Sequence, residues 1–287
     1  MIYVFAALGV GFAAGLIFLF LHNTSFETER MTIESENVMR DFTVVQLSDL
    51  HGRRYKKSIE KAVRALSPEL IVLTGDMFAE PGEKDEEKKR EATLRLFSEL
   101  SQIAPCYAVF GNHEHRLDDL PALAHDMRAC GVHILSNDVH LFLCRGQRVA
   151  IAGMDAAAGR QGTFHTAAAG EAQQAVLERL GTVGADALKI VLDHYPENFA
   201  LQKEMSYNHL AFDVMFAGHA HGGQVRLPGV GGLYAPGQGT LPKFTSGVYG
   251  EKPPYLVVSR GLGGHAYLPR VGNRAQIVAL TITPKKS

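Results

Sequence analysis

The stretch that decides the fold is Asp213-Val-Met-Phe-Ala-Gly-His219-Ala-His221-Gly-Gly-Gln224. An apolar run of strand length stops at a glycine, and two histidines one residue apart follow. In an extended segment, side chains two residues apart share a face and lie roughly 6–7 Å apart. His219 and His221 can therefore reach two different metal ions. A GHxH pattern alone is a weak indication, and it gains weight from four earlier apolar runs that also stop at Asp, Asn or His.

The chain before this stretch alternates apolar runs with amphipathic, charged segments, which is typical of α/β layering. Continuous apolar runs indicate strands that are buried on both faces. Strands are predicted over Met31–Ser35, Phe42–Leu47, Leu70–Thr74, Tyr107–Phe110, Arg148–Gly153, Leu188–Leu192, Val214–Ala217, Tyr255–Ser259 and Ala275–Thr283. Helices are predicted over Lys57–Leu66, Glu83–Ile103, Leu120–Cys130 and Glu171–Leu180. This order predicts mixed β-sheet layers packed as a sandwich within one domain.

Polar side chains follow five of these strands, each at the point where the strand ends. They are Asp49 with His51, Asp76, Asn112 with His113, His194, and His219 with His221. Ligands bind at the carboxyl ends of the strands in open α/β sheets. Turn chemistry alone favours Gly, Asn and Asp at strand ends, but five such coincidences argue for a common site.

This set of donors is too rich in oxygen and nitrogen for a single tetrahedral zinc site. It suits two divalent ions, such as manganese, iron or zinc, that share a carboxylate. Two ions ~3.5–4 Å apart can hold a bridging hydroxide and clamp the attacking and leaving oxygens of an in-line displacement. The pattern therefore indicates hydrolysis of a phosphate ester.

The order of the motifs resembles the calcineurin-like metallophosphoesterases over roughly Phe42 to Gln224. The five matching blocks are Asp49-x-His51, Gly75-Asp76, Gly111-Asn112-His113-Glu114, His194 and Gly218-His219-x-His221. The resemblance implies a four-layered α/β/β/α sandwich. Two further blocks, Gly222-Gly-Gln224 and Tyr234-Ala-Pro-Gly-Gln238, resemble the membrane-associated bacterial branch that includes YkuE-like phosphoesterases and UDP-2,3-diacylglucosamine pyrophosphatases of the LpxG type.

The resemblance also implies a role for each motif residue. Asp49, His51 and His221 would hold a first metal ion. Asn112, His194 and His219 would hold a second, and Asp76 would bridge the two. His113 would face the substrate and either protonate the leaving oxygen or stabilise the transition state, because an imidazole that titrates near neutral pH can act as such an acid.

Residues 1–21 contain no charged side chain, and about 20 apolar residues in a helix span the hydrocarbon core of a bilayer. A cleaved signal peptide is the alternative, but a positive n-region and an A-x-A-like cleavage site are both missing. We therefore expect an uncleaved transmembrane anchor over residues 1–22, a tether and first strand over 23–40, and the phosphoesterase domain over 41–287. This implies a single-pass protein of the cell membrane, with the side of the domain left open because few basic residues flank the span.

Composition excludes other classes of protein. The chain has 29 basic and 30 acidic residues, so nucleic-acid binding through bulk charge is not expected. Its three cysteines are sparse and odd in number, which argues against a disulfide framework and against a thiolate zinc site.

The expected substrate is a small-molecule or lipid-linked phosphoester, and either a phosphoester or a pyrophosphate bond could be cleaved. Two alternatives stay open: a cell-surface phosphodiesterase that acts on cell-wall polymer, and a non-catalytic, metal-dependent membrane scaffold. Arg53 and Arg54 are candidate contacts for a substrate phosphate, although solvated arginines fit equally well. His265, in a glycine-rich turn, is a further candidate.

Overall fold

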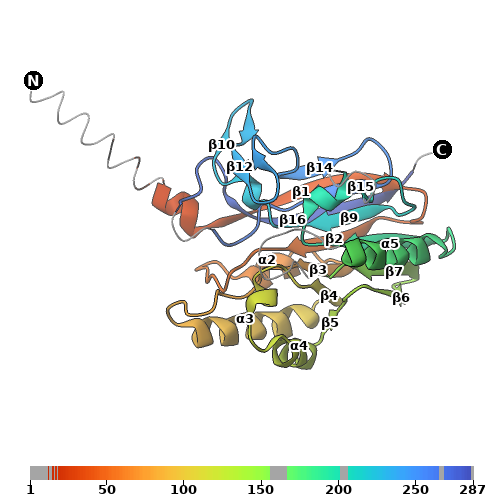
Figure 1. Ribbon diagram of the computed structural model, residues 1–287, viewed down its shortest axis with the longest axis horizontal. Helices are drawn as coiled ribbons and strands as arrows, with labels where there is room; N and C mark the ends of the chain where they lie inside the picture. The colour runs from red at the N-terminus through yellow and green to blue at the C-terminus, as the bar shows by residue number, and fades with distance from the viewer. Residues whose placement is uncertain are drawn as a thin grey trace, which may run out of the picture.

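The computed structural model describes residues 12, 15, 17, 19–155, 167–200, 206–264 and 268–285, without the side chains of residues 167–170. Two six-stranded sheets dominate the described part of the chain, and Figure 1 shows α3 and α4 along the lower face of the molecule.

The first sheet has the strand order β1-β16-β2-β3-β4-β5. Strands β2 to β5 run parallel to one another, and β16 is antiparallel to β2. Parallel neighbours need crossover connections, and α2, α3 and α4 supply packing on the outer face of this sheet. The bounds are β1 Phe26–Ser35, β16 Ala275–Pro284, β2 Phe42–Leu47, β3 Leu70–Thr74, β4 Cys106–Val109, β5 Val132–Ile134, α2 Ile59–Arg64, α3 Glu86–Ser101 and α4 Leu120–Ala129.

The second sheet has the strand order β14-β15-β9-β8-β7-β6. Its four central strands are parallel and both edge strands are antiparallel. Helix α5 and the short helix η2 cover its outer face. The bounds are β14 Gly247–Tyr249, β15 Tyr255–Val258, β9 Val214–Ala217, β8 Ala187–Leu192, β7 Gln147–Gly153, β6 Asp138–Cys144, α5 Ala167–Gly181 and η2 Pro196–Phe199.

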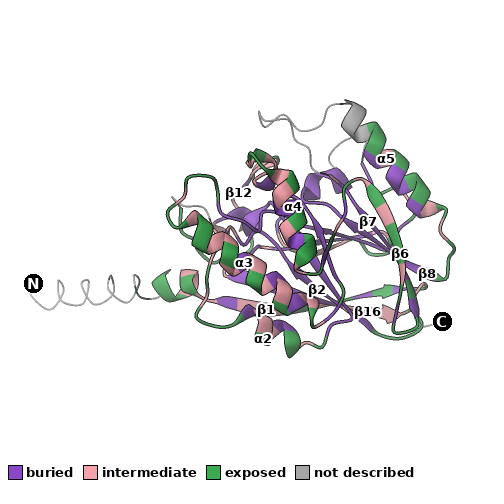
Figure 2. Cartoon of the chain, turned by 90° about the horizontal axis from the view of Figure 1, so that it is seen from below, coloured by how far each residue is buried: buried purple, intermediate pink, exposed green. Residues whose placement is uncertain are grey.

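The core between the two sheets follows from the alternation of side chains along each strand. Along β2, Val45 and Leu47 pack against the helices, whereas Phe42 and Val44 pack against the second sheet. The buried residues therefore form three apolar layers, one between the sheets and one under each set of helices, and Figure 2 shows the buried strands inside the exposed helices. This is the expected α/β/β/α arrangement.

The predicted strands over residues 42–47, 70–74 and 214–217 are confirmed to the residue. The first strand is longer than predicted, because β1 begins at Phe26. Strands β5 and β6 were not predicted. Nor were the two short hairpins in the Gly/Pro-rich loop, which are β10 Arg226–Leu227 with β11 Gly231–Gly232 and β12 Tyr234–Ala235 with β13 Gly239–Thr240.

The expected transmembrane anchor falls mostly on residues outside those described. Among the described residues, no helix has both the length and the apolar character that a membrane crossing requires.

Phe97 in α3 is fully buried against the first sheet and meets the ring of Phe78 edge to face at a centroid distance of 5.7 Å. We predict that Phe97→Ala lowers the free energy of unfolding by about 3–5 kcal/mol, because it removes apolar contacts and leaves a cavity. The exposed neighbour Glu99 is the control, and Glu99→Ala should stay within about 0.5 kcal/mol of the parent. Urea-induced unfolding measures both, and equal losses would contradict this account of the core.

Candidate metal centre

Five strands end at the same edge of the molecule, where the two sheets meet. Strands β2, β3 and β4 belong to the first sheet, whereas β8 and β9 belong to the second. Backbone hydrogen bonds join the loops after these strands: Asp49 N donates to Gly75 O at 3.0 Å, and Gly218 N donates to His194 O at 3.1 Å. The structure brings all seven predicted metal ligands and His113 together at this edge.

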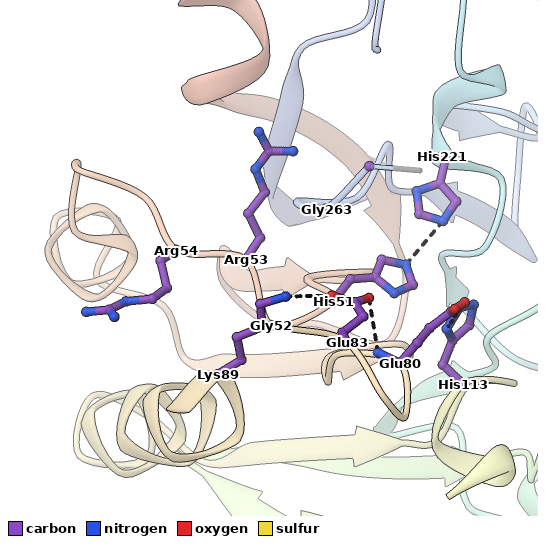
Figure 3. Close-up of a pocket in the computed structure, with 11 residues that line it drawn as sticks. His51, Gly52, Arg53, Arg54, Glu80, Glu83, Lys89, His113, His221 and Gly263 are labelled. Carbon is purple, nitrogen blue, oxygen red and sulfur yellow. Dashed lines mark hydrogen bonds and ion pairs between the residues drawn. The ribbon is translucent and has the colours of Figure 1, made fainter. Parts of the chain in front are cut away.

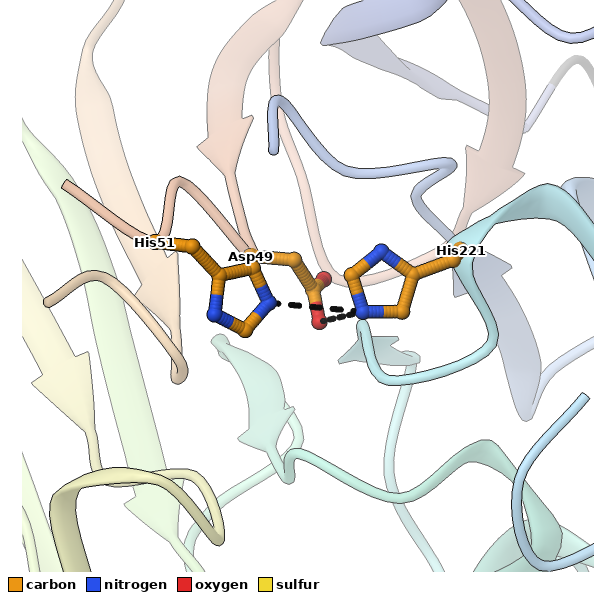
Figure 4. Close-up of side chains that lie close together, drawn as sticks. All are labelled: Asp49, His51 and His221. Carbon is orange, nitrogen blue, oxygen red and sulfur yellow. Dashed lines mark hydrogen bonds and ion pairs between the residues drawn. The ribbon is translucent and has the colours of Figure 1, made fainter. Parts of the chain in front are cut away.

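The first cluster consists of Asp49, His51 and His221 (Figure 4). The Nε2 atoms of the two histidines lie 3.4 Å apart, and His221 Nε2 lies 3.6 Å from Asp49 Oδ1. Asp49 and His221 are buried and His51 is partly buried. Three donor atoms thus point at one small volume.

The second cluster consists of Asp76, His194 and His219. His194 Nε2 lies 3.2 Å from Asp76 Oδ2, 3.1 Å from His219 Nδ1 and 3.2 Å from Asn112 Oδ1. Asp76 also forms a group with His51 and His113. It is therefore the carboxylate that lies between the two clusters.

These separations fit two bound divalent ions. Metal–nitrogen bonds of about 2.0–2.1 Å place two ligands of one ion about 3.0–3.4 Å apart in octahedral or tetrahedral geometry. The donors are two carboxylates, one amide oxygen and imidazoles, which suit borderline divalent ions. Two carboxylates do not neutralise two divalent ions, so the loaded site would carry positive charge suited to a phosphate.

A hydrogen bond fixes which nitrogen of His194 can bind a metal. His194 Nδ1 lies 2.7 Å from the carbonyl oxygen of Thr74. A ring N–H at Nδ1 satisfies that carbonyl, and Nε2 is then directed at the cluster, which is a common arrangement behind metal-binding histidines.

Burial and charge set the protonation of the second cluster. Burial would lower the pKa of His194, but the charge of Asp76 and its hydrogen bond raise that pKa to about 10. Burial would raise the pKa of Asp76, yet the same pairing lowers it well below its usual range. Burial and the positive charge of His194 lower the pKa of His219. In the metal-free protein, a proton on His194 therefore offsets the charge of Asp76.

Asp49 in the first cluster behaves differently. Burial raises its pKa to about 6, although the positive charge of His194 opposes the shift. A divalent ion at this cluster would hold the carboxylate in its charged form.

The sequence motif predicted no role for Glu114, but the structure assigns it one. It lies in the short helix η1 (Glu114–Arg116) and is buried. Its carboxylate accepts hydrogen bonds from the backbone N–H groups of Asp76 at 2.8 Å, Met77 at 2.7 Å and Gly111 at 2.9 Å. The feature of the sequence that could have pointed to this role is that Glu114 directly follows Asn112-His113 in the motif.

Two glycines are required by close approach to the ligands. A Cβ atom on Gly218 would lie 1.9 Å from Ser48 Oγ and 2.5 Å from Asp49 Oδ2. A Cβ atom on Gly111 would lie 2.2 Å from Asp76 Oδ1. Both glycines thus leave space for carboxylates of the candidate metal sites.

A pocket of about 420 Å³ opens next to the first cluster (Figure 3). His51, His113 and His221 form one wall of the pocket, and Arg53 and Arg54 lie on another side. Lys89, Glu80 and Glu83 also line it, and none of these three was singled out in the sequence, because they lie on a loop and a helix that carry no motif.

The histidine that follows the Asn112-His113-Glu114 motif has a different partner. His115 Nε2 pairs with Asp155 Oδ1 at 2.7 Å, so it does not join a described cluster. His265 lies outside the described residues.

Comparison with known proteins agrees with this geometry. Residues 42–223 match the calcineurin-like phosphoesterase family, and the chain belongs to that family. It is 28% identical over 254 residues to the uncharacterized metallophosphoesterase YkuE of Bacillus subtilis, covering 85% of this chain and 81% of the relative. It is 26% identical over 250 residues to the phosphodiesterase YaeI of Escherichia coli, covering 84% of this chain and 82% of the relative.

Among solved structures, a dimetal phosphatase from Danio rerio is similar with a TM-score of 0.45 and 13% identity, covering 84% of this chain and 98% of that one. With the family match and the two clusters, the protein is a metal-dependent phosphoesterase.

We predict that metal binding at the second cluster releases about one proton per protein molecule at pH 7.5. The pKa of His194 in the metal-free protein is about 10, so its proton is present at that pH and must leave when Nε2 binds a metal. Isothermal titration with Mn²⁺ or Zn²⁺ in two buffers of different ionisation enthalpy measures the release. Identical heats in the two buffers would contradict the assignment.

Proposed function

We propose that this protein hydrolyses a phosphodiester or pyrophosphate bond in a lipid-linked substrate, and that it is held at a cell membrane by its N-terminal segment. The observation that carries the hydrolytic part is the pair of donor clusters around Asp76, next to a pocket that contains cationic side chains. The metal could be manganese, iron or zinc, since these donors accept all three.

Two divalent ions in these clusters would supply an activated water and stabilise negative charge on the phosphate oxygens. Asp49, His51 and His221 would hold one ion, and Asn112, His194 and His219 the other, with Asp76 shared. The role of the remaining pocket residues is to bind and orient the substrate.

His113 is the side chain placed to act on the leaving oxygen. Its Nδ1 lies 3.0 Å from Glu80 Oε1 and its Nε2 lies 3.6 Å from Asp76 Oδ2. The negative charge of Glu80 favours a proton on Nδ1 of the ring, with Nε2 directed toward the clusters. The imidazole would then hold a proton at Nε2 for the departing alkoxide.

The substrate preference rests on charge and on the neighbouring chain. Arg53 and Arg54 line the pocket, and in the described part of the chain neither forms an ion pair with a carboxylate, whereas Lys89 is paired with Glu83 at 2.5 Å. Two guanidinium groups that no carboxylate neutralises within the described residues favour a substrate with a second anionic group. Arg53 also donates a hydrogen bond to Asn23 O, at the end of the apolar N-terminal stretch, which favours a lipid-linked substrate.

The proposal is tested by a screen of phosphomonoesters, phosphodiesters and pyrophosphates against Mn²⁺, Zn²⁺, Fe²⁺ and Mg²⁺, with Asp76→Asn as the inactive control. Asn keeps the acceptor for His113 N, which lies 2.8 Å from Asp76 Oδ1, but removes the shared charge. We expect activity to fall by at least about 10³-fold, with the circular dichroism spectrum unchanged. Full turnover by Asp76→Asn would disprove the two-metal mechanism, and inertness of the parent toward every ester would favour the scaffold.

Glu80→Gln tests the orientation of His113. We predict about a tenfold loss on a diester with an alkyl leaving group and little loss on bis(p-nitrophenyl) phosphate, because nitrophenolate leaves without a proton. Glu83→Gln is the matched control, since Glu83 lines the same pocket but pairs with Lys89. Equal losses by Glu80→Gln on both substrates would mean that Glu80 only shapes the pocket.

A further inference from the structure

Exposed apolar side chains gather at one end of the molecule. Of the thirteen large apolar side chains that are exposed in the described part of the chain, four lie between residues 12 and 21 and six between residues 227 and 271. The six are Leu227, Val230, Tyr234, Leu241, Leu268 and Val271. Exposed apolar side chains that gather on one part of a surface are typical of an interaction site.

Hydrogen bonds join these segments into one surface. Arg226 N donates to Val271 O at 2.9 Å, which ties the β10–β11 hairpin to the loop that follows residue 268. Asn23 Nδ2 donates to Arg270 O at 2.9 Å and Asn23 Oδ1 accepts from Arg270 N at 2.8 Å, which ties that loop to the N-terminal segment. Figure 1 places β10 and β12 in the half of the molecule from which the N-terminal segment leaves, and Figure 2 places β12 in that half as well.

The tip of the β10–β11 hairpin is apolar. Leu227-Pro228-Gly229-Val230 forms a turn in which Val230 N donates to Leu227 O at 3.1 Å and Gly229 has a φ of 76°. Proline and glycine at the two central positions are typical of a type II turn. The flanking Leu227 and Val230 are 45% and 57% exposed, at positions where a solvated turn usually carries polar residues.

A basic run lies beside this apolar surface. Arg53-Arg54-Tyr55-Lys56-Lys57 carries four cations, and among the described residues none of the four forms an ion pair with a carboxylate. Arg53 contacts Asn23 O, and Lys57 Nζ lies 4.9 Å from the ring centroid of Phe26. The run therefore lies against the end of the N-terminal segment.

We propose that this surface docks on an anionic lipid membrane, with the hairpin tip inserted among the lipids and the basic run on the headgroups. Proteins bind anionic lipid surfaces by burying apolar side chains among the lipids and by placing basic side chains on the headgroups. Arg53 and Arg54 belong both to the basic run and to the substrate pocket, so docking places the pocket mouth at the headgroups. The link to a lipid-linked substrate rests on the proposed function, whereas the docking itself does not.

The chain offers a direct test because its 287 residues contain no tryptophan. Val230→Trp places one indole at the hairpin tip. Leu143→Trp is the control, on edge strand β6, where Leu143 is 69% exposed. Each protein is reconstituted in vesicles of phosphatidylcholine and phosphatidylglycerol, with and without brominated phosphatidylcholine.

We expect the tryptophan emission of Val230→Trp to shift to the blue in vesicles. The brominated lipid should lower its fluorescence intensity roughly twofold or more, because interfacial segments enter the bilayer by about 5–10 Å. The Leu143→Trp emission should show neither. A solvent-like, unquenched emission from Val230→Trp would overturn the proposal. So would a blue shift that needs no vesicles and rises with protein concentration, since a second copy would then cover the surface.

The basic run is tested by adding Lys56→Gln/Lys57→Gln to Val230→Trp. The control pair is Lys252→Gln/Lys285→Gln, which removes the same charge around a different pocket. We expect the first pair, and not the control, to need several-fold more phosphatidylglycerol for the same quenching. Equal behaviour of the two pairs would overturn the role of the basic run.

Hydrolysis of bis(p-nitrophenyl) phosphate, measured on the same samples, separates the two proposals. Quenching of Val230→Trp in a protein that hydrolyses no ester would overturn the proposed function and support the docking. Hydrolysis of the ester without quenching of Val230→Trp would overturn the docking and support the proposed function.

Discussion

The buried carboxylate of Glu114 accepts hydrogen bonds from four backbone N–H groups, and the geometry of the metal centre depends on it. The donors are Asp76, Met77, Phe78 and Gly111, at 2.7–3.2 Å. A buried carboxylate is costly unless its oxygens are satisfied, and hydrogen bonds to a charged acceptor are among the stronger ones. One side chain thus fixes the loop after β3 to the loop after β4. These two loops carry Asp76 and Asn112, the candidates for the shared carboxylate and the amide ligand.

Strain in the backbone is the second feature of this edge. Five of the seven candidate ligands have φ angles between 46° and 63°, in the left-handed region: Asp49, His51, Asp76, His219 and His221. Each such residue costs on the order of 1 kcal/mol or more and persists only where the surroundings fix it. Here the surroundings are backbone hydrogen bonds from Asp49 N to Gly75 O and from His51 N to Asp76 O, both 3.0 Å. The prediction that His219 and His221 lie in an extended segment is therefore wrong, because the chain turns sharply at both residues.

Whether a strand could be predicted from the sequence depended on how far both of its faces are buried. The strands over residues 42–47, 70–74 and 214–217 were found to the residue because both of their faces are buried, which leaves a continuous apolar run. Strand β6 was missed because it is an edge strand with exposed and polar positions, and β5 has only three residues. The candidate ligands that the structure brings together could be picked out because they follow strand ends, which are visible in the sequence. Glu80 was not, since its contact with His113 depends on a loop path that no local pattern encodes.

Arg270 connects the N-terminal segment to the metal centre. It is 1% exposed, and its guanidinium donates to the carbonyl oxygens of Gly263 at 2.7 Å and Arg260 at 2.6 Å. Burial lowers its pKa to about 10, so it stays charged at neutral pH. A buried cation satisfied by carbonyl groups holds those groups firmly, because leaving it unsatisfied is costly.

Arg270 contacts the pocket wall, the first metal cluster and the N-terminal segment. Its guanidinium holds the turn at Gly263 that forms part of the pocket wall, and lies 3.5 Å from the ring of His221. Its own backbone is held on both sides by the amide of Asn23. The end of the N-terminal segment is therefore connected to the first metal cluster through Asn23 and Arg270. Arg270 thus joins the N-terminal segment to the pocket wall at Gly263. The surface proposed to meet a membrane and the pocket proposed to bind a phosphate share Arg53 and Arg54.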